Sequence, residues 1–331
     1  PEAKQLFTSL GLEDFIENRL DNTKFINNLT ESLKPTKLSL EQEKELFIQN
    51  MCYFIDTLLE QKPQSNGRLK TPLNDIIKSL LIMEYNGMSY RRTQSDLREM
   101  HKQGILNKII PRSTLDRYSN KREIKDLLKK LIETSAMFFI EEENALIIDS
   151  SWFGLQMYVH SYKSIEDLRV MNFKKTRKLH IGCLRKSKII AYATTSSGTA
   201  HDSPFFEEIV SKVIKNGFKI ETLLADKGYC SKANYKTCQD LDIRKVFIDF
   251  RNNVRIMRSK SLLWREGLRM YNKHPDIWKD SYRFRPLIEG VFSAIKRKNT
   301  NYLRSRNETA QDVELLLKVL VYNLTVIGRF S

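Results

Sequence analysis

The spacing of apolar residues divides the chain into a helical first part and a mixed second part. Over residues 1–60 apolar positions recur every three or four residues, as at Phe47, Met51 and Phe54, which is the spacing of an amphipathic helix. The next ten residues, 61–70, are polar and contain Pro and Gly, so they are typical of a linker. We therefore predict a helical N-terminal segment that ends near residue 60.

Three short helices are predicted over residues 71–140. The first spans 73–85 and follows Thr71-Pro72, because Thr is a good cap and Pro is favoured at the first helical position. The second is expected over 90–103, and the third begins at Ser113. Three short helices with a Gly-containing turn resemble a helix-turn-helix.

Basic side chains make this helical region a candidate DNA-binding region. Arg112 and Arg117 accompany the third helix, which is where a recognition helix presents side chains to DNA. The alternative is a small helical bundle whose Arg and Lys side chains are only solvated. The basic charge of the chain favours contact with DNA, but this pattern alone leaves both interpretations open.

Short apolar runs and alternating segments predict strands from residue 144 on. The strands are expected at 145–148, 179–184, 189–195, 220–225 and 245–248, with helices opening at Ser203 and Ser231 between the last three. Three strands, helix, strand, helix, strand is the order of the ribonuclease H-like fold. We therefore predict an α/β domain over 144–331, with a mixed sheet flanked by helices. A long apolar helix over 309–327 is expected to pack on the sheet.

Charge is unevenly distributed along the chain. The 331 residues include 56 Lys and Arg against 40 Asp and Glu, a net charge of +16, which makes nucleic acid the expected large partner. Residues 244–306 alone hold 17 Lys and Arg against 5 Asp and Glu, a net of +12. A short basic insertion is predicted here, over about 250–281. Its interleaved aromatic residues suit stacking on unpaired bases, or alternatively form a small core of a helical insertion.

Several classes of protein are excluded by what the sequence lacks. The four cysteines are scattered, which argues against a zinc site or a disulfide framework. No GxxxxGK loop is present, which sets aside a kinase, an ATPase or a helicase. The most apolar run, 315–328, is interrupted by Lys318 and Asn323 and is too short to span a membrane. We expect a cytoplasmic, nucleoid-associated protein with no membrane partner.

Three acidic residues stand out by position. Asp149 and Asp226 directly follow predicted strands, and Glu289 lies on a helix predicted to begin at Pro286. An acid after a strand is commonly a turn former, but in this fold order the first and fourth strands are neighbours and the last helix crosses near their ends. Converging carboxylates would repel each other without cations, and their oxygens suit Mg²⁺, with Mn²⁺ as a substitute. Two such ions can activate a water or a 3′-hydroxyl and stabilise the leaving oxygen of a phosphodiester.

The segments around these acids resemble a known family. Asp226-Lys227-Gly228-Tyr229 is similar to the second-acid motif of DDE transposases of prokaryotic insertion sequences. The Tyr-Arg-Glu-Lys signature of one large group of them is matched in full by Tyr282, Arg285, Glu289 and Lys296. The resemblance extends over about 73–325. One departure is that only 63 positions separate Asp226 from Glu289, too few for the large β-rich insertion that some members carry.

The resemblance implies roles for individual residues. The three acids, Asp149, Asp226 and Glu289, would be the catalytic residues and the ligands of two Mg²⁺ ions per site. Contacts to DNA near the cut are implied for Tyr282, Arg285, Lys296 and Lys227. The physical chemistry agrees, because Arg binds two phosphate oxygens at once and Lys supplies a point charge.

Two further features receive ordinary structural interpretations. Trp152, three residues past Asp149, is expected in the core rather than stacked on a displaced base. The segment His201-Asp202-Ser203 is also similar to the transposase group, but a helix is predicted to begin directly after it. Asp202 and Ser203 are therefore interpreted as caps of that helix.

The sequence thus predicts a DNA transposase that binds transposon ends, cleaves phosphodiesters by two-metal-ion catalysis and joins the 3′-OH ends to target DNA. The resemblance also implies a homodimer that holds two ends. One alternative is a metal-dependent ribonuclease H-like nuclease without strand transfer. Another is a domesticated DNA-binding regulator without catalysis, although a mere binder has no use for a cluster of acids that faces DNA.

Overall fold

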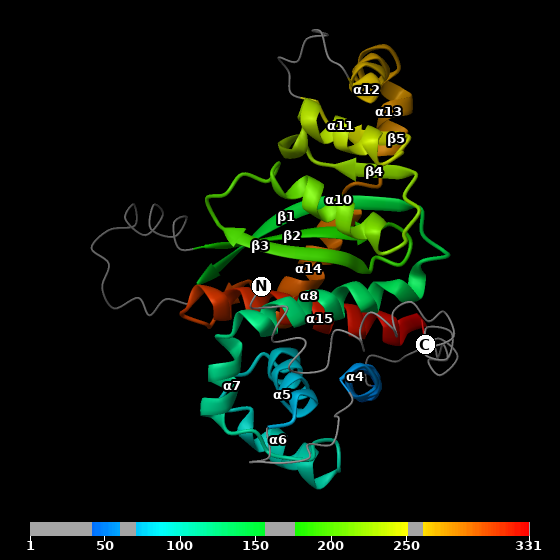
Figure 1. Ribbon diagram of the computed structural model, residues 1–331. Helices are drawn as coiled ribbons and strands as arrows, with labels where there is room; N and C mark the ends of the chain where they lie inside the picture. The colour runs from blue at the N-terminus through cyan, green and yellow to red at the C-terminus, as the bar shows by residue number, and fades with distance from the viewer. Residues whose placement is uncertain (1–41, 60–70, 156–175, 251–260, 331) are drawn as a thin grey trace, which may run out of the picture. The chain divides into compact units, whose positions relative to one another are not determined.

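The sheet of the predicted catalytic domain is present and carries the expected strand order. The computed structural model describes residues 42–59, 71–155, 176–250 and 261–330 (Figure 1). These residues divide into a helical unit and a sheet unit. The helical unit comprises the chain up to Phe138, residues 298–300 and the chain from Arg304 on. The sheet unit comprises Phe139–Arg297 and Asn301–Leu303. The predicted helices before residue 42 and the predicted linker lie outside the described residues.

Five strands of the sheet unit follow the order β3-β2-β1-β4-β5. β1, β2 and β3 are antiparallel neighbours, β4 and β5 run parallel to β1, and β6 pairs with the far end of β1. The strands are β1 Ala145–Leu155, β2 Arg177–Leu184, β3 Ile190–Ser197, β4 Thr222–Ala225, β5 Lys245–Ile248 and β6 Tyr302–Leu303. This order confirms the predicted fold class: an α/β fold with a mixed ribonuclease H-like sheet and a helical N-terminal region.

Strand β1 is longer than its apolar run predicts. The run ends at Ile148, but the strand continues through Asp149 to Leu155. The reason is pairing across the sheet: the antiparallel ladder with β2 extends from Leu146 to Phe153, and these backbone hydrogen bonds hold polar residues in the strand. Asp149 therefore lies within a strand and not after one, which corrects the prediction.

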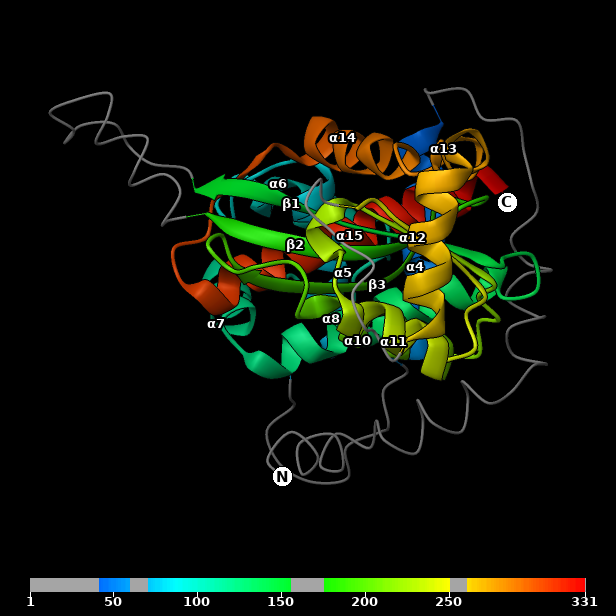
Figure 2. The same cartoon turned by 90° about the horizontal axis from the view of Figure 1, so that it is seen from above.

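Helices cover both faces of the sheet. α10 Phe205–Lys215 and α11 Lys232–Asp240 lie on one face, and α14 Leu287–Asn299 lies on the other (Figures 1 and 2). Gly182 on β2 permits close packing of α10, because a Cβ there would lie 2.7 Å from Ile209 Cγ2. The predicted cap of α11 is confirmed, since Ser231 Oγ accepts a hydrogen bond from the backbone N–H of Asn234 at 3.1 Å.

The basic insertion has an aromatic core of its own. Its described part forms α12 Leu262–Lys273 and α13 Pro275–Tyr282, which pack against β5. Trp264 and Trp278 are buried, and both contact the ring of Phe250 edge-on or tilted. These rings pack against each other, so they are not displayed for stacking on bases. The alternative of a helical insertion with a small core is the correct one for these residues.

The helical unit is built around the C-terminal helix. Its members are α4 Glu43–Leu58, α5 Leu73–Tyr85, α6 Gln94–Lys102, α7 Arg112–Ser119, α8 Arg122–Ala136 and α15 Glu308–Phe330. α15 packs against α8, α4 and α5, and its side chains are buried along almost the whole helix. From the sequence we predicted that this helix packs on the sheet, whereas in the structure it belongs to the helical unit. Apolar burial alone does not reveal which partner covers a helix.

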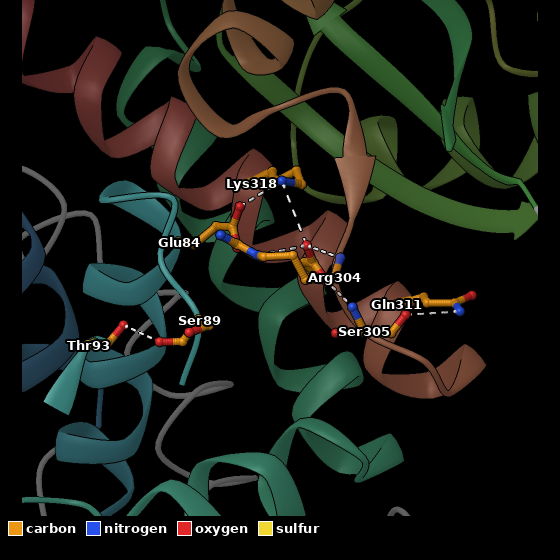
Figure 3. A network of polar contacts seen from close by, with 8 residues as sticks. Glu84, Ser89, Thr93, Arg304, Ser305, Gln311 and Lys318 are labelled. Carbon is orange, nitrogen blue, oxygen red and sulfur yellow. Dashed lines mark hydrogen bonds and ion pairs between the residues drawn. The ribbon is translucent and has the colours of Figure 1, made fainter. Parts of the chain in front are cut away.

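Buried charges join α5 and α15 (Figure 3). Lys318 and Glu84 are fully buried, and Lys318 Nζ donates a hydrogen bond to Glu84 Oε1 at 2.7 Å. Arg304 also donates to Glu84, at 2.6 Å, and its backbone N–H donates to Glu314. Burial raises the pKa of the Glu84 carboxyl, and the two cations oppose that effect. The charges of this cluster balance, which is the condition under which buried ions are tolerated.

Lys318→Met is expected to lower the free energy of unfolding by about 3–5 kcal/mol, because it leaves Glu84 and Glu314 with one buried cation instead of two. Urea denaturation followed by circular dichroism measures this. Lys236→Met is the matched control: Lys236 pairs with Asp240 on the surface, where both side chains are more than half exposed, so the control should change stability by less than about 0.5 kcal/mol. Equal effects of the two variants would contradict the prediction.

Candidate active site

The three predicted acids converge on one guanidinium group. Arg285 Nη2 lies 2.7 Å from Asp149 Oδ2 and 3.9 Å from Asp226 Oδ2. Arg285 Nη1 donates to a carboxylate oxygen of Glu289. Three carboxylates that are far apart in sequence therefore face a common cation within the sheet unit.

The fold explains this convergence. β1 and β4 are parallel neighbours, and Ile148 pairs with Ala225, so the acids that follow these two residues lie at the same level of the sheet. α14 lies on one face of the sheet and carries Glu289 in its first turn. Arg285 lies in the turn between α13 and α14, four residues before Glu289.

The acids differ in their exposure to solvent. The Asp149 side chain is 13% exposed, whereas those of Asp226 and Glu289 are 41% and 60% exposed. Burial raises the pKa of Asp149 to about 6, and the attraction of Arg285 and the hydrogen bond from the backbone N–H of Ser150 oppose the rise. The most buried acid thus depends most strongly on a nearby cation to stay ionised.

The donor chemistry of the cluster fits a divalent cation. Within the described ranges, no three acidic, His or Cys side chains are arranged to hold a metal ion as they stand. The guanidinium itself contacts all three carboxylates. Carboxylate oxygens are the ligands that Mg²⁺ and Mn²⁺ prefer, so these acids suit a metal provided that Arg285 moves away from them.

The remaining signature residues contact the strands that carry the acids. The Tyr282 hydroxyl donates to the carbonyl of Ala225, directly before Asp226, at 3.3 Å. Lys296 Nζ donates to Ser151 Oγ on β1 at 2.7 Å. Lys227 is exposed. Contact of these side chains with DNA stays a prediction.

Lys296 and Glu289 were predicted to share one face of their helix. Ser151, the partner of Lys296, is two residues after Asp149 on β1, so both β1 residues lie on the same face of the sheet. Glu289 reaches that face through Arg285, which contacts Asp149. The contacts therefore agree with a single stripe of α14 along β1.

A second polar cluster lies on the opposite face of β1 and was not predicted. Asp202 Oδ1 accepts hydrogen bonds from Ser150 Oγ at 2.7 Å and from Lys178 Nζ at 2.9 Å. His180 is fully buried beside it, with Nε2 2.9 Å from Ser196 Oγ. The only sequence signal for this cluster was the segment that contains Asp202, and it was interpreted as a helix cap.

Trp152 corrects another prediction. Its side chain is 45% exposed instead of lying in the core. Its Nε1 donates to the carbonyl of Gly198 at 2.9 Å, and Lys178 Nζ lies 4.6 Å from the ring centroid. The ring lies on the same face of β1 as Ser150, because alternate residues of a strand share a face.

His180 is expected to make the stability of the protein depend on pH. Burial lowers its pKa from 6.5 to about 4; Asp202 and Glu208 oppose this, and Lys178 adds to it. The unfolded state binds the proton more tightly, so the stability conferred by neutral His180 is complete above pH 6.5, falls progressively between pH 6.5 and 4, and is lost below pH 4. The difference corresponds to roughly 3 kcal/mol.

Urea unfolding at pH 4.5, 5.5 and 7 measures this contribution. Wild-type protein should lose more stability between pH 7 and 4.5 than His180→Gln, which has no group that titrates there. The comparison of slopes matters, because other residues titrate in both proteins. Parallel pH dependences would contradict the prediction.

The candidate DNA-binding residues lie in the helical unit. Arg112 and Arg117 are exposed on α7. The Arg117 guanidinium lies 5.6 Å from the centroid of the Tyr118 ring, and Lys121 Nζ lies 4.6 Å from the same centroid. The second helix of the predicted motif begins at Gln94 and not at residue 90, because residues 90–93 form turns.

No helix in the described part of the chain is long and apolar enough to cross a membrane.

Comparison with known proteins identifies the family. A search of curated proteins gives no match. Among solved structures, the chain is similar to one described as a cryo-EM structure of the piggyBac transposase synaptic complex with hairpin DNA. That likeness has 12% sequence identity and a TM-score of 0.43, and covers 87% of this chain and 74% of that chain. The family model described as a transposase DDE domain matches residues 142–324, more than half of the 331 residues; the chain belongs to the DDE transposase family.

Proposed function

We propose that this protein is a DNA transposase that binds transposon ends, cleaves DNA phosphodiesters and joins the 3′-OH ends to target DNA. The observation that carries the proposal is the convergence of Asp149, Asp226 and Glu289 on one cation, in a chain of the DDE transposase family. Nucleases of the same fold can share such a cluster, so strand transfer is the step that defines the proposal.

Asp149, Asp226 and Glu289 would hold the divalent ions, Mg²⁺ or in its place Mn²⁺. Two such ions, when bound, activate the attacking oxygen and stabilise the leaving oxygen of a phosphodiester. The protein contributes a rigid frame: Asp149 is paired with Ile181 of β2 directly after the ladder with β4 ends at Ile148, and Tyr282 holds the end of β4 next to Asp226.

Arg285 has two successive tasks in this proposal. In the structure its single positive charge lies among the three carboxylates and reduces their mutual repulsion. Once divalent ions take over that task, its guanidinium is available to bind DNA phosphate, for which its planar fork of donors is suited. Lys296 and Lys227 would add positive charge along the backbone of the DNA.

The helical unit is proposed to recognise the transposon end, with Arg112 and Arg117 on the exposed side of α7. Two ends must be held for joining, so we propose a homodimer in the end-bound complex. We also propose that the protein acts on nucleoid DNA in the cytoplasm.

Arg117→Ala in the full chain should reduce the preference for transposon-end DNA over random DNA by about 1–3 kcal/mol if the side chain reaches a base edge. Fluorescence anisotropy with both DNAs at one salt concentration measures the preference. An equal loss on both DNAs would instead identify Arg117 as a phosphate contact, and no loss on either would remove it from the interface.

The function is tested by incubating the full chain with DNA that carries the flanking inverted repeats, a supercoiled target and Mg²⁺. Sequencing gels then report cleavage and joining. Ends joined to the target support the transposase. Cleavage without joining would favour a nuclease, and binding without cleavage would favour a regulator.

A further inference from the structure

The segment before α10 does not perform the task expected of it. Pro204 is the N-cap residue of α10, and no side chain caps the helix. Asp202 and Ser203 both direct their side chains elsewhere. Two adjacent polar residues that are not used as caps, in a region next to the acids, require another explanation.

Asp202 contacts the strand that carries Asp149. Its Oδ1 accepts a hydrogen bond from Ser150 Oγ at 2.7 Å. The backbone N–H of the same Ser150 donates to Asp149 Oδ1 at 2.8 Å. Ser150 is thus held on one side by Asp202 and itself holds the Asp149 carboxylate, so Asp202 acts on Asp149 across the thickness of the sheet.

Ser203 is linked through Asn234 to the segment that carries Asp226. Asn234 Nδ2 lies 3.1 Å from Ser203 Oγ and 2.7 Å from the carbonyl oxygen of Tyr229, and it donates to both. The backbone N–H of Tyr229 in turn donates to the carbonyl of Asp226 at 2.9 Å. Asn234 is 5% exposed, so water has little access to its amide as an alternative hydrogen-bond partner.

The two contacts also meet in space. A Cβ placed on Gly228, two residues after Asp226, would lie 3.5 Å from Asp202 Oδ2. The Asp202 carboxylate therefore lies close to the backbone after Asp226, with room for about one methyl group between them. One short turn thus contacts the segment that presents Asp149 and is linked through Asn234 to the segment that presents Asp226.

We propose that Asp202 and Ser203 are positioning residues that fix Asp149 and Asp226 relative to each other for binding of the divalent ions. This proposal rests on the proposed function. Outer partners that orient metal ligands typically contribute 10–100-fold to metal affinity or activity. Asp202 touches none of the proposed ligands directly, so its effect must pass through Ser150 and the backbone near Gly228.

A simpler role must be distinguished from this one. Lys178 is 5% exposed, and a buried ammonium group needs a partner. If Asp202 only neutralises Lys178, then removing both charges should restore the protein. If Asp202 positions the acids, removing both charges should restore folding but not metal affinity.

The experiment measures Mn²⁺ binding by the full chain without DNA, from the loss of the free-ion signal in electron paramagnetic resonance. Single-turnover cleavage and thermal unfolding are measured beside it. Asp202→Asn and Ser150→Ala should each weaken Mn²⁺ binding and slow cleavage, Asp202→Asn by about 10–100-fold. Ser150→Thr retains the hydroxyl and should recover most of both. The double variant Asp202→Leu/Lys178→Met should have the thermal unfolding temperature of the wild type and should still bind Mn²⁺ weakly.

Asp240→Asn is the control, since it removes a carboxylate from an exposed pair on α11 and should change nothing. Wild-type Mn²⁺ affinity in folded Asp202→Asn, or in the double variant, would overturn the positioning role but not the proposed function. Should Asp202→Asn fail to fold, Ser150→Ala against Ser150→Thr decides. Wild-type protein that neither binds Mn²⁺ nor cleaves DNA would overturn this proposal together with the proposed function.

Discussion

Asp226→Asn is expected to abolish DNA cleavage while binding of transposon-end DNA is retained. The change keeps the size of the side chain and removes the charge that a divalent ion needs. Asp226 is a cleaner test than the buried Asp149, because its side chain is 41% exposed and Arg285 keeps Asp149 and Glu289 as partners when it is changed. Single-turnover cleavage and anisotropy binding on the same DNA measure the two quantities.

Asp242→Asn is the matched control. Asp242 lies just after α11 of the sheet unit and is 85% exposed, and its positive φ of 54° is readily adopted by Asn. The control should cleave like wild type. Cleavage by Asp226→Asn at more than a few per cent of the wild-type rate would remove Asp226 from the site.

Arg285→Gln is expected to change metal binding and cleavage in opposite directions. Without DNA, divalent ions compete with the guanidinium for the oxygens of three carboxylates. Removing that competitor should tighten Mn²⁺ binding by about tenfold or more, since one charged hydrogen bond contributes about 1.5–3 kcal/mol. Cleavage should fall all the same, because the phosphate loses its fork of donors.

Calorimetric titration with Mn²⁺ and single-turnover cleavage test this pair of outcomes. Arg283→Gln is the control: Arg283 lies in the same turn and forms an exposed ion pair with Asp280, so its loss should affect neither quantity. Weaker Mn²⁺ binding in Arg285→Gln would show that the arginine organises the acids instead of competing for them.

Elements with a strong local pattern were predictable from the sequence. β5 at Lys245–Ile248 and α5 at Leu73–Tyr85 are found over the predicted residues, because a buried strand and a helix that ends at Asn-Gly carry their signals within themselves. β1 was predicted too short, since its second half is held by its partner strand. The partner of α15 was missed for a related reason, as an apolar helix does not reveal which surface covers it.

The site shows the same division. The candidate acids were proposed from the sequence, Asp149 and Asp226 from their places after apolar runs and Glu289 from one spaced signature, and the structure brings them together. The cluster around Asp202 could not, because Ser150, Lys178 and Asp202 come together only when β1, β2 and the turn before α10 are assembled. Trp152 was misplaced because a large aromatic residue is usually buried, and here it lies at the surface.

The position of α15 after the sheet unit in chain order affects how the protein is made. The helical unit begins before Phe138 but receives α15 only after about 170 further residues, which take roughly 10–30 s to synthesise at ordinary rates of translation. During that interval α4, α5 and α8 lack the helix that packs against all three of them, while all six strands, β1 to β6, are synthesised before Glu308. The sheet unit can therefore fold on the ribosome first. A nascent chain that stalls before Glu308 would expose apolar faces of α4, α5 and α8 to chaperones and proteases.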